Sequence, residues 1–212
     1  MPRLPIYLLL DVSGSMSGDP ISAVQSGIQS MVSTLSSDPQ NTDIVYISII
    51  TFSDDARQIV PLTELSRFEA PQLSAKGRTC LGKALEYVAS CAARDVVKSS
   101  SNRKGDYQPM VFLMTDGWAT DEIEAGLTAF NKIKWGNVVA CGAGNAATDE
   151  LLKIAKDPRN VVALETADAA SIMSFFRWII DIVSTSSKSV GQEDADSPFE
   201  LPPRPGEIKS ML

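Results

Sequence analysis

The chain has 212 residues, of which 44% are hydrophobic and 21% charged, as is ordinary for a globular domain with a full-sized core. The net charge of −7 argues against a general binder of nucleic acids or of anionic membranes, because both require basic surface. No apolar run approaches the roughly 18 residues of a membrane span. Histidine is absent, which excludes nucleophiles activated by histidine and the usual zinc clusters.

The first half of the chain alternates between strand-like and helix-like segments. Residues 3–10 are a nearly continuous apolar run, as in a strand covered on both faces. Asp19 reads as the cap of a helix with apolar residues at helical spacing, which ends at the polar stretch 36–42. Residues 43–52 predict a second buried strand. Residues 57–62 predict a short strand antiparallel to it, and Pro61 suits an edge position.

The second half continues the alternation after a loop. Its segments read, in order, as helix, strand, helix, strand, helix, strand and helix, at about 81–92, 109–115, 121–133, 137–144, 148–156, 160–165 and 168–184. Six strands with interleaved helices predict a doubly wound, mostly parallel six-stranded sheet with helices on both faces and one antiparallel edge strand. Such a chain is of the α/β class.

The end of the chain differs from the rest. The last predicted helix is apolar over more than one stripe, so it is either deeply packed or partly in contact with a partner or a second copy. From about Ser186 the composition becomes polar and proline-rich. We therefore expect one domain over residues 1–185, followed by a flexible or extended tail, residues 186–212.

The three cysteines, Cys80, Cys91 and Cys141, form no close-spaced pair of the metal-binding or redox kind. Cys80 and Cys91 fall near one predicted helix, about 16 Å apart at 1.5 Å per residue. A disulfide tolerates only about 7 Å between Cα atoms. We therefore expect reduced, mostly buried thiols, which suits a cytoplasmic protein.

Oxygen-bearing side chains gather where strands end, which is where open parallel sheets bind ligands. Asp11, Ser13 and Ser15 follow the first strand, Thr79 opens a helix and Asp116 follows the third buried strand. Two carboxylates and three hydroxyls are hard donors that suit Mg²⁺, with Mn²⁺ or Ca²⁺ as substitutes. Each piece alone could be an ordinary turn or helix cap. Their coincidence at three strand-to-helix junctions predicts a metal site.

The motif "DVSGSMSG", residues 11–18, resembles the Asp-x-Ser-x-Ser signature of von Willebrand factor A (VWA) domains, the metal-ion-dependent adhesion site (MIDAS). Thr79 stands where the family's isolated threonine is expected, and Asp116, in "MTDG", where its second aspartate is expected. The resemblance covers roughly residues 3–184. It implies a Rossmann-like VWA fold and a non-enzymatic module that binds protein partners through a metal.

The resemblance also implies a role for each of these residues. Ser13, Ser15 and Thr79 would be hydroxyl ligands of the metal, while Asp11 and Asp116 would act directly or through bound waters. An acidic side chain, Glu or Asp, from a protein partner would complete the coordination. The chain looks most like bacterial TerY-type proteins associated with tellurite resistance. That likeness implies a scaffold or regulator in a stress-response system that includes a protein kinase and a phosphatase.

One neighbour of the motif departs from the family pattern. Family members often carry a proline-threonine pair soon after "TDG", whereas this chain reads "TDGWATDE". Trp118 would stand at the rim of the site. Two interpretations stay open: a loop tryptophan packed locally, or an aromatic anchor for the partner, since tryptophan is enriched at interface hot spots.

The main alternative is a metal-dependent phosphotransferase or phosphohydrolase of the haloacid-dehalogenase type. That family also places an aspartate after its first strand, and Asp116 with Asp121 could imitate its later acidic element. Its chemistry needs a second aspartate two residues after the nucleophile to protonate the leaving group. Here that position is Ser13, so we interpret the chain as no enzyme. A structural adaptor with a vestigial metal site is a third hypothesis, against which the intact set of five ligand positions argues.

Overall fold

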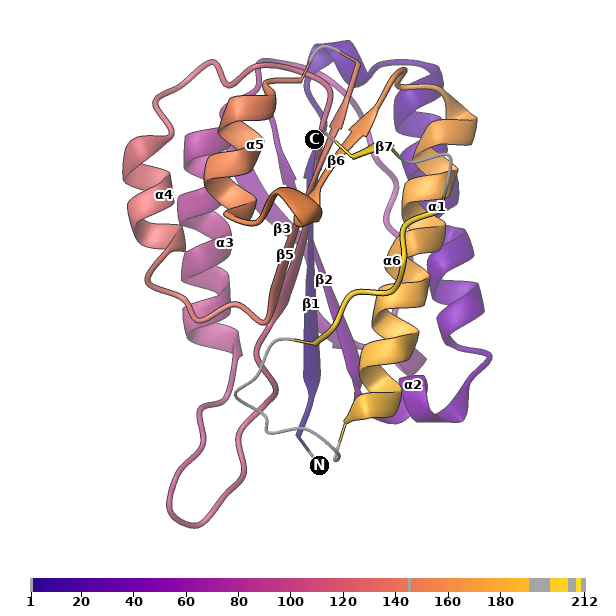
Figure 1. Ribbon diagram of the computed structural model, residues 1–212, viewed down its shortest axis with the longest axis vertical. Helices are drawn as coiled ribbons and strands as arrows, with labels where there is room; N and C mark the ends of the chain where they lie inside the picture. The colour runs from indigo at the N-terminus through magenta and orange to yellow at the C-terminus, as the bar shows by residue number, and fades with distance from the viewer. Residues whose placement is uncertain (1, 145, 191–198, 206–208, 211–212) are drawn as a thin grey trace.

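The computed structural model describes residues 2–144, 146–190, 199–205 and 209–210, and it shows one central sheet between two layers of helices (Figure 1). The strands are β1 (Leu4–Asp11), β2 (Val45–Phe52), β3 (Ala56–Glu64), β4 (Met110–Thr115), β5 (Asn137–Ala143), β6 (Val161–Leu164) and β7 (Lys209–Ser210). The helices are α1 (Asp19–Leu35), α2 (Pro39–Ile44), α3 (Leu81–Asp95), α4 (Glu124–Phe130), α5 (Thr148–Ala155) and α6 (Ala169–Ser189). Short 3₁₀ turns lie at Gly14–Met16, Leu65–Arg67 and Pro158–Asn160.

The sheet has the strand order β3-β2-β1-β4-β5-β6-β7. Strands β2, β1, β4, β5 and β6 pair in parallel, and β3 is an antiparallel edge strand beside β2. The predicted fold class is therefore confirmed. The two residues of β7 add a short antiparallel pairing on β6, at the other edge. The chain moves from β1 to β2 on one side and then to β4 on the other, so the switch in strand order lies at β1.

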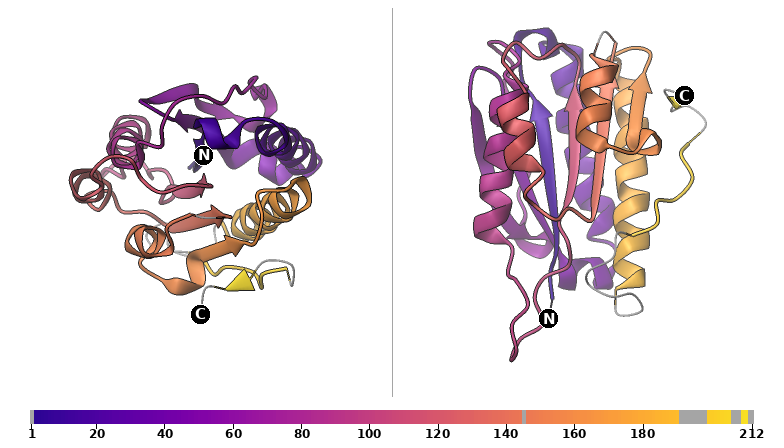
Figure 2. Two further views of the ribbon diagram at one scale, coloured as in Figure 1. Left: turned by 90° about the horizontal axis from the view of Figure 1, so that it is seen from above. Right: turned by 60° about the vertical axis from the view of Figure 1, so that its left-hand side comes forward.

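Strand β1 is buried along its whole length because both of its faces are covered. Leu8 and Leu10 belong to the core cluster that also contains residues of α1 and α6. Tyr7 and Leu9 point to the opposite face and pack with residues of α3, α4 and α5. This alternation follows from the period of two along a strand. Figure 2 shows the two helix layers on either side of the sheet.

Helix α6 is deeply packed, which favours the first of the two interpretations of its apolar surface. Ile180 is partly buried, and five other large apolar residues of this helix are buried: Ile172, Phe175, Phe176, Ile179 and Val183. Helix α1 lies against it at close range. A Cβ atom added at Gly27 would come within 2.2 Å of the Phe176 ring, so only glycine fits there without a shift of that side chain.

Local details differ from the sequence expectations at both ends of the first helix. Helix α1 begins at Asp19 itself and its cap is Gly18, whose φ of 85° lies in the left-handed region that favours glycine. The polar stretch after α1 is not only a turn. Asp38 accepts a hydrogen bond from the backbone of Gln40 and Pro39 occupies the first turn, and together they begin the short helix α2.

Helix α6 and part of the expected tail pack on the body of the protein. Helix α6 runs to Ser189, past the expected domain end at residue 185. Residues 199–205 lie extended beside α6, while 191–198, 206–208 and 211–212 of the expected tail are outside the described residues (Figure 1). The three cysteines are free and buried, as expected. Across the described ranges, no helix combines the length and the apolar character needed to span a bilayer.

Candidate metal centre

Three loops meet at the carboxyl ends of β1 and β4, and they carry the five side chains predicted as metal ligands. The loop after β1 is joined to the segment before α3 by a hydrogen bond from Gly14 N to Gly77 O of 2.9 Å. That segment is joined in turn to the loop after β4 by a bond from Thr120 N to Thr79 O of 2.8 Å. The loops are thus tied to one another through their backbones.

Four of the five predicted residues form one continuous chain of hydrogen bonds. Asp11 Oδ1 accepts from Ser13 N at 2.7 Å, and the Ser13 and Ser15 hydroxyls are 3.0 Å apart. Ser15 Oγ then donates to Asp116 Oδ1 at 2.7 Å, which bridges the loops after β1 and β4. Residues 101 positions apart in the sequence are therefore in direct contact.

The fifth residue, Thr79, lies beside the same cluster. Its Oγ1 is 3.5 Å from the position that a Cβ would take at Gly117, next to Asp116. The side chain is only 6% exposed, and its hydroxyl makes no hydrogen bond within the part of the chain that the structure describes. Thr79 thus offers an oxygen with no protein partner at the edge of the cluster.

A residue that the sequence reasoning missed, Thr115, holds Asp11 in place. Thr115 Oγ1 donates to Asp11 Oδ2 at 2.6 Å, and both side chains are 1% exposed. Burial raises the pKa of the Asp11 carboxyl, while the hydrogen bonds from Thr115 and Ser13 lower it, and the net effect is an increase. The available signal was a polar residue at the end of an otherwise apolar strand, one position before Asp116.

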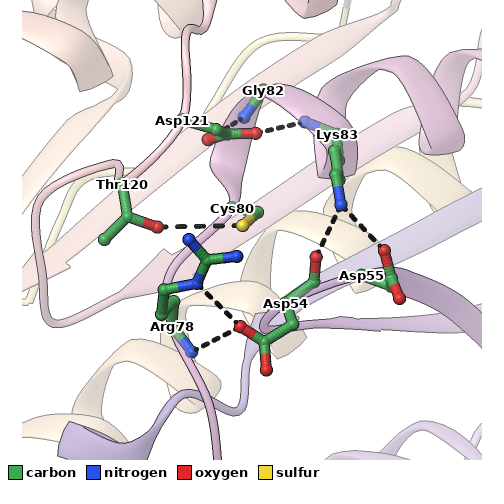
Figure 3. Close-up of polar contacts among 8 residues, drawn as sticks. All are labelled: Asp54, Asp55, Arg78, Cys80, Gly82, Lys83, Thr120 and Asp121. Carbon is green, nitrogen blue, oxygen red and sulfur yellow. Dashed lines mark hydrogen bonds and ion pairs between the residues drawn. The ribbon is translucent and has the colours of Figure 1, made fainter.

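The segment that carries Thr79 is fixed to the β2–β3 turn by Asp54 (Figure 3). Its carboxylate oxygen Oδ1 accepts from Arg78 N at 3.3 Å and from Arg78 Nε at 3.0 Å. Gly77 has a φ of 83°, and a Cβ there would lie 2.5 Å from Asp54 Oδ2. A glycine at position 77 is therefore needed both for conformation and for space. Lys83 strengthens the connection with a hydrogen bond from its Nζ to Asp54 O at 2.9 Å.

Asp121, which could imitate the later acidic element of the phosphotransferase alternative, instead binds the backbone at the start of α3. Its two carboxylate oxygens accept from the backbone N–H groups of Gly82 and Lys83, each at 3.0 Å (Figure 3). These are among the N–H groups that a helix leaves without an internal partner, and a carboxylate there also suits the helix dipole. Asp121 therefore ties the loop after β4 to the helix that Thr79 precedes.

The oxygen cluster fits a hard divalent cation. The residues described by the structure include no group of three or more His, Cys, Asp or Glu side chains placed to hold a metal. The five side chains here contribute only two carboxylates and three hydroxyls, all oxygen donors. In the same described residues no ion pair involves Asp11 or Asp116, so no lysine or arginine neutralises them.

Trp118 lies two residues after Asp116 and is 65% exposed. Among the residues that the structure describes, the other exposed large hydrophobic side chains, Ile59 and Tyr87, are 37% and 36% exposed. This exposure does not agree with local packing of the indole. Its role as an anchor for a partner stays a prediction.

The fold and the oxygen-bearing loops at the ends of its parallel strands define an α/β domain with a candidate metal site. The family model described as von Willebrand factor type A domain matches residues 6–177, and the chain belongs to this family. Domains of the family are generally non-enzymatic and commonly mediate metal-dependent protein interactions.

Solved structures share the fold at low sequence identity. A von Willebrand factor type A protein from Catenulispora acidiphila has a TM-score of 0.63 and 20% identity, over 87% of this chain and 43% of that chain. The pilus adhesin SpaC from Lactobacillus rhamnosus GG, in its open conformation, gives 0.65 and 16%, over 88% and 30%. Proximal thread matrix protein 1 from the mussel byssus, described with a zinc-occupied MIDAS motif, gives 0.60 and 18%, over 86% and 48%. The chain thus spans less than half the length of these three proteins.

Proposed function

We propose that the protein is a metal-dependent protein-interaction module whose metal captures an acidic side chain of a partner protein. The metal would be held by Asp11, Ser13, Ser15, Thr79 and Asp116. The observation that carries this proposal is the chain of hydrogen bonds from Asp11 through Ser13 and Ser15 to Asp116, which brings the oxygens of two loops together without a neutralising cation.

The chemistry of the donor set explains why a carboxylate would be the ligand. When bound, the ion supplies positive charge and an exchangeable coordination position. Three of the five protein donors are neutral hydroxyls, so the protein offsets less of the ion's charge than a fully carboxylate site would. The remaining charge favours an incoming Glu or Asp, even though the whole protein has a net charge of −7.

The surface beside the site supports an acidic partner as well. A cavity of about 390 Å³ is lined by Val12, which lies between two of the proposed ligands, and by Arg57 and Lys76. Within the described residues neither of these cations is in an ion pair, whereas Asp54 and Asp55 on the same wall are already paired. The cationic groups that remain would attract an acidic partner and speed its approach.

We propose Mg²⁺ as the ion because hydroxyl and carboxylate oxygens are the donors that it prefers. Mn²⁺ or Ca²⁺ could substitute, and the mussel protein named above is described with zinc. Calorimetric titration with each ion tests the preference. We expect binding of Mg²⁺ or Mn²⁺ to be lost when Ser13 and Ser15 are both replaced by alanine. It should be kept in Ser17→Ala, a matched control at an exposed serine of the same loop.

The proposal extends to the biological setting through the resemblance to TerY-type proteins. In that setting the module would be a cytoplasmic scaffold or regulator of a bacterial tellurite and stress response, with a protein kinase and a phosphatase as partners. Its support is the likeness of the stretch "RLPIYLLLDVSGSM", residues 3–16. A pull-down from the native host in Mg²⁺ and in EDTA tests it: a kinase or phosphatase should be recovered only with the metal.

The function itself is tested by selecting a random peptide library on the immobilised protein in Mg²⁺. We expect the enriched peptides to share a Glu or Asp and to be released by EDTA. Peptides without a common acidic residue would contradict the proposal. Mg²⁺-dependent phosphatase turnover that is lost in Asp11→Asn would instead favour the phosphotransferase alternative.

A further inference from the structure

Residues 199–205 lie against the body of the protein near the first residues of β5 and β6, and the contacts there resemble those of a bound peptide. The surface that they contact, which we call the tail groove, comprises Tyr107, Asn137, Val161 and Trp178. Tyr107 precedes β4, Asn137 and Val161 begin β5 and β6, and Trp178 belongs to α6. Figure 1 shows the segment in yellow beside α6.

Side chains of the body bind the backbone of the segment. The Asn137 amide makes two hydrogen bonds to Phe199: Nδ2 donates to the carbonyl at 3.0 Å, and Oδ1 accepts from the N–H at 3.2 Å. Trp178 Nε1 donates to Pro202 O at 3.2 Å. Asn137 and Trp178 are 7% and 1% exposed, so they are well fixed. Such contacts bind an extended chain whatever its side chains are.

Three side chains of the segment supply the sequence-specific contacts. Leu201 is partly buried and packs against the core cluster that contains Trp178. Phe199 is 5% exposed and packs against Tyr107, with ring centroids 6.1 Å apart. The Arg204 guanidinium lies 5.9 Å from the centroid of the Trp178 ring and donates to Val161 O at 3.3 Å. Glu200 and Pro203 are exposed, and Pro202 is bound through its backbone carbonyl. The recognised pattern is therefore Phe-x-Leu-x-x-Arg.

We propose that the tail groove is a peptide-binding site for extended Phe-x-Leu-x-x-Arg segments, that the chain's own tail is its resident ligand, and that a segment of the same pattern from another molecule binds there once the tail is weakened or released. Residues 199–205 form no helix or strand and contact the body through the groups named above. Prolines restrict the free segment, which lowers the entropy cost of binding. Backbone hydrogen bonds combined with side-chain pockets are how extended peptides are recognised in general.

The tail has a large advantage over any free peptide because it belongs to the same chain as the groove. A ligand tethered within one chain acts at an effective concentration on the order of millimolar. A free peptide therefore competes poorly with the intact tail and binds well only when the tail is weakened. We therefore expect a free peptide to bind variants with a weakened tail more tightly than it binds the wild-type protein.

The probe is a fluorescent peptide of residues 197–206, SPFELPPRPG, and the readout is its anisotropy with the full chain. We expect it to bind Phe199→Ala protein at least about tenfold more tightly than wild type, because the resident tail is weakened there. A peptide with Phe199 replaced by alanine should fail to bind. A peptide with Glu200 replaced by alanine, a control at an exposed position, should bind unchanged.

Two further variants separate groove binding from loss of fold. Asn137→Leu added to Phe199→Ala should abolish peptide binding while circular dichroism stays native. Arg204→Ala weakens the tail without touching the buried ring, so it replaces Phe199→Ala if that variant does not fold. Equal peptide affinity in wild type and in the folded tail variants, or no binding to either, would overturn the proposal.

Discussion

Replacing Thr115 with valine removes one hydroxyl while keeping the shape of the side chain. That hydroxyl donates to Asp11 Oδ2 at 2.6 Å, and both residues are 1% exposed, so water cannot replace it without rearrangement. A hydrogen bond to a charged group contributes about 1.5–3 kcal/mol, and the volume is conserved, so no cavity adds to the loss. We expect the free energy of unfolding to fall by about that amount in urea titrations with EDTA.

The loss should depend on pH with a definite sign. The Thr115 hydrogen bond favours the ionised form of Asp11, whose pKa burial has raised above its usual value. Without that bond the pKa of Asp11 is higher still in the variant. The difference in stability between wild type and Thr115→Val is therefore full at pH values above the variant's pKa, and it shrinks as the pH falls from there to the pKa of the wild type. Thr128→Val, at an exposed position of α4, is the control and should change stability by less than about 0.5 kcal/mol. Equal stability of wild type and Thr115→Val at neutral pH would refute the reasoning.

Three further substitutions probe other parts of the structure. Gly126→Ala should lower the free energy of unfolding by about 1–3 kcal/mol in thermal unfolding, because the added Cβ would lie 2.1 Å from Gly82 O. An unchanged stability would contradict the close contact of α3 and α4. Burial raises the pKa of Asp106, but the hydrogen bonds and charge of Arg3 and the hydrogen bond from Val97 N together outweigh it, and the net pKa is lowered. Its stabilisation is therefore present above about pH 4 and is lost as the pH falls through the lowered pKa. Asp106→Asn should therefore destabilise more at pH 7 than at pH 3 in urea titrations, and an equal loss at both would count against the ion pair. Trp118→Ala should leave stability within about 0.5 kcal/mol of wild type but weaken binding of Mg²⁺-dependent peptides, whereas unchanged peptide affinity would reject the anchor.

Much of the fold could be predicted because its signals are local and repeated. Continuous apolar runs such as residues 4–10 are required where helices cover both faces of a strand. Pro61 marked the edge strand because proline cannot donate to a sheet ladder. The start of α1 was less accessible, since its cap depends on the positive φ of Gly18 and not on a side chain. Helix α2 is too short to show a periodic pattern.

The candidate site, like the fold, could be predicted from the sequence only in part. The spacing of Ser13 and Ser15 in one short loop is visible in the sequence, and the structure places both beside Asp116. The contact of Thr115 with Asp11 follows from the register of β1 against β4, where Leu10 pairs with Met114, and no local pattern shows that register.

Two other contacts also depend on distant parts of the chain. Asp121 looked like a possible catalytic acid until the structure placed it on the first N–H groups of α3. Residues 199–205 belong to a stretch, from about Ser186 onward, that is polar and proline-rich, and this composition says nothing of their contacts with Asn137 and Trp178. Long-range partners of this kind cannot be derived from composition.

The most direct test of the account is the affinity of one acidic peptide from the library selection, measured in Mg²⁺ and in EDTA. Wild type and Ser17→Ala should bind it in Mg²⁺ and release it in EDTA. The double variant Ser13→Ala, Ser15→Ala should keep its fold by circular dichroism and lose the peptide in both buffers. Equal affinity in Mg²⁺ and EDTA, or normal binding by the double variant, would contradict a metal-mediated interaction at this site.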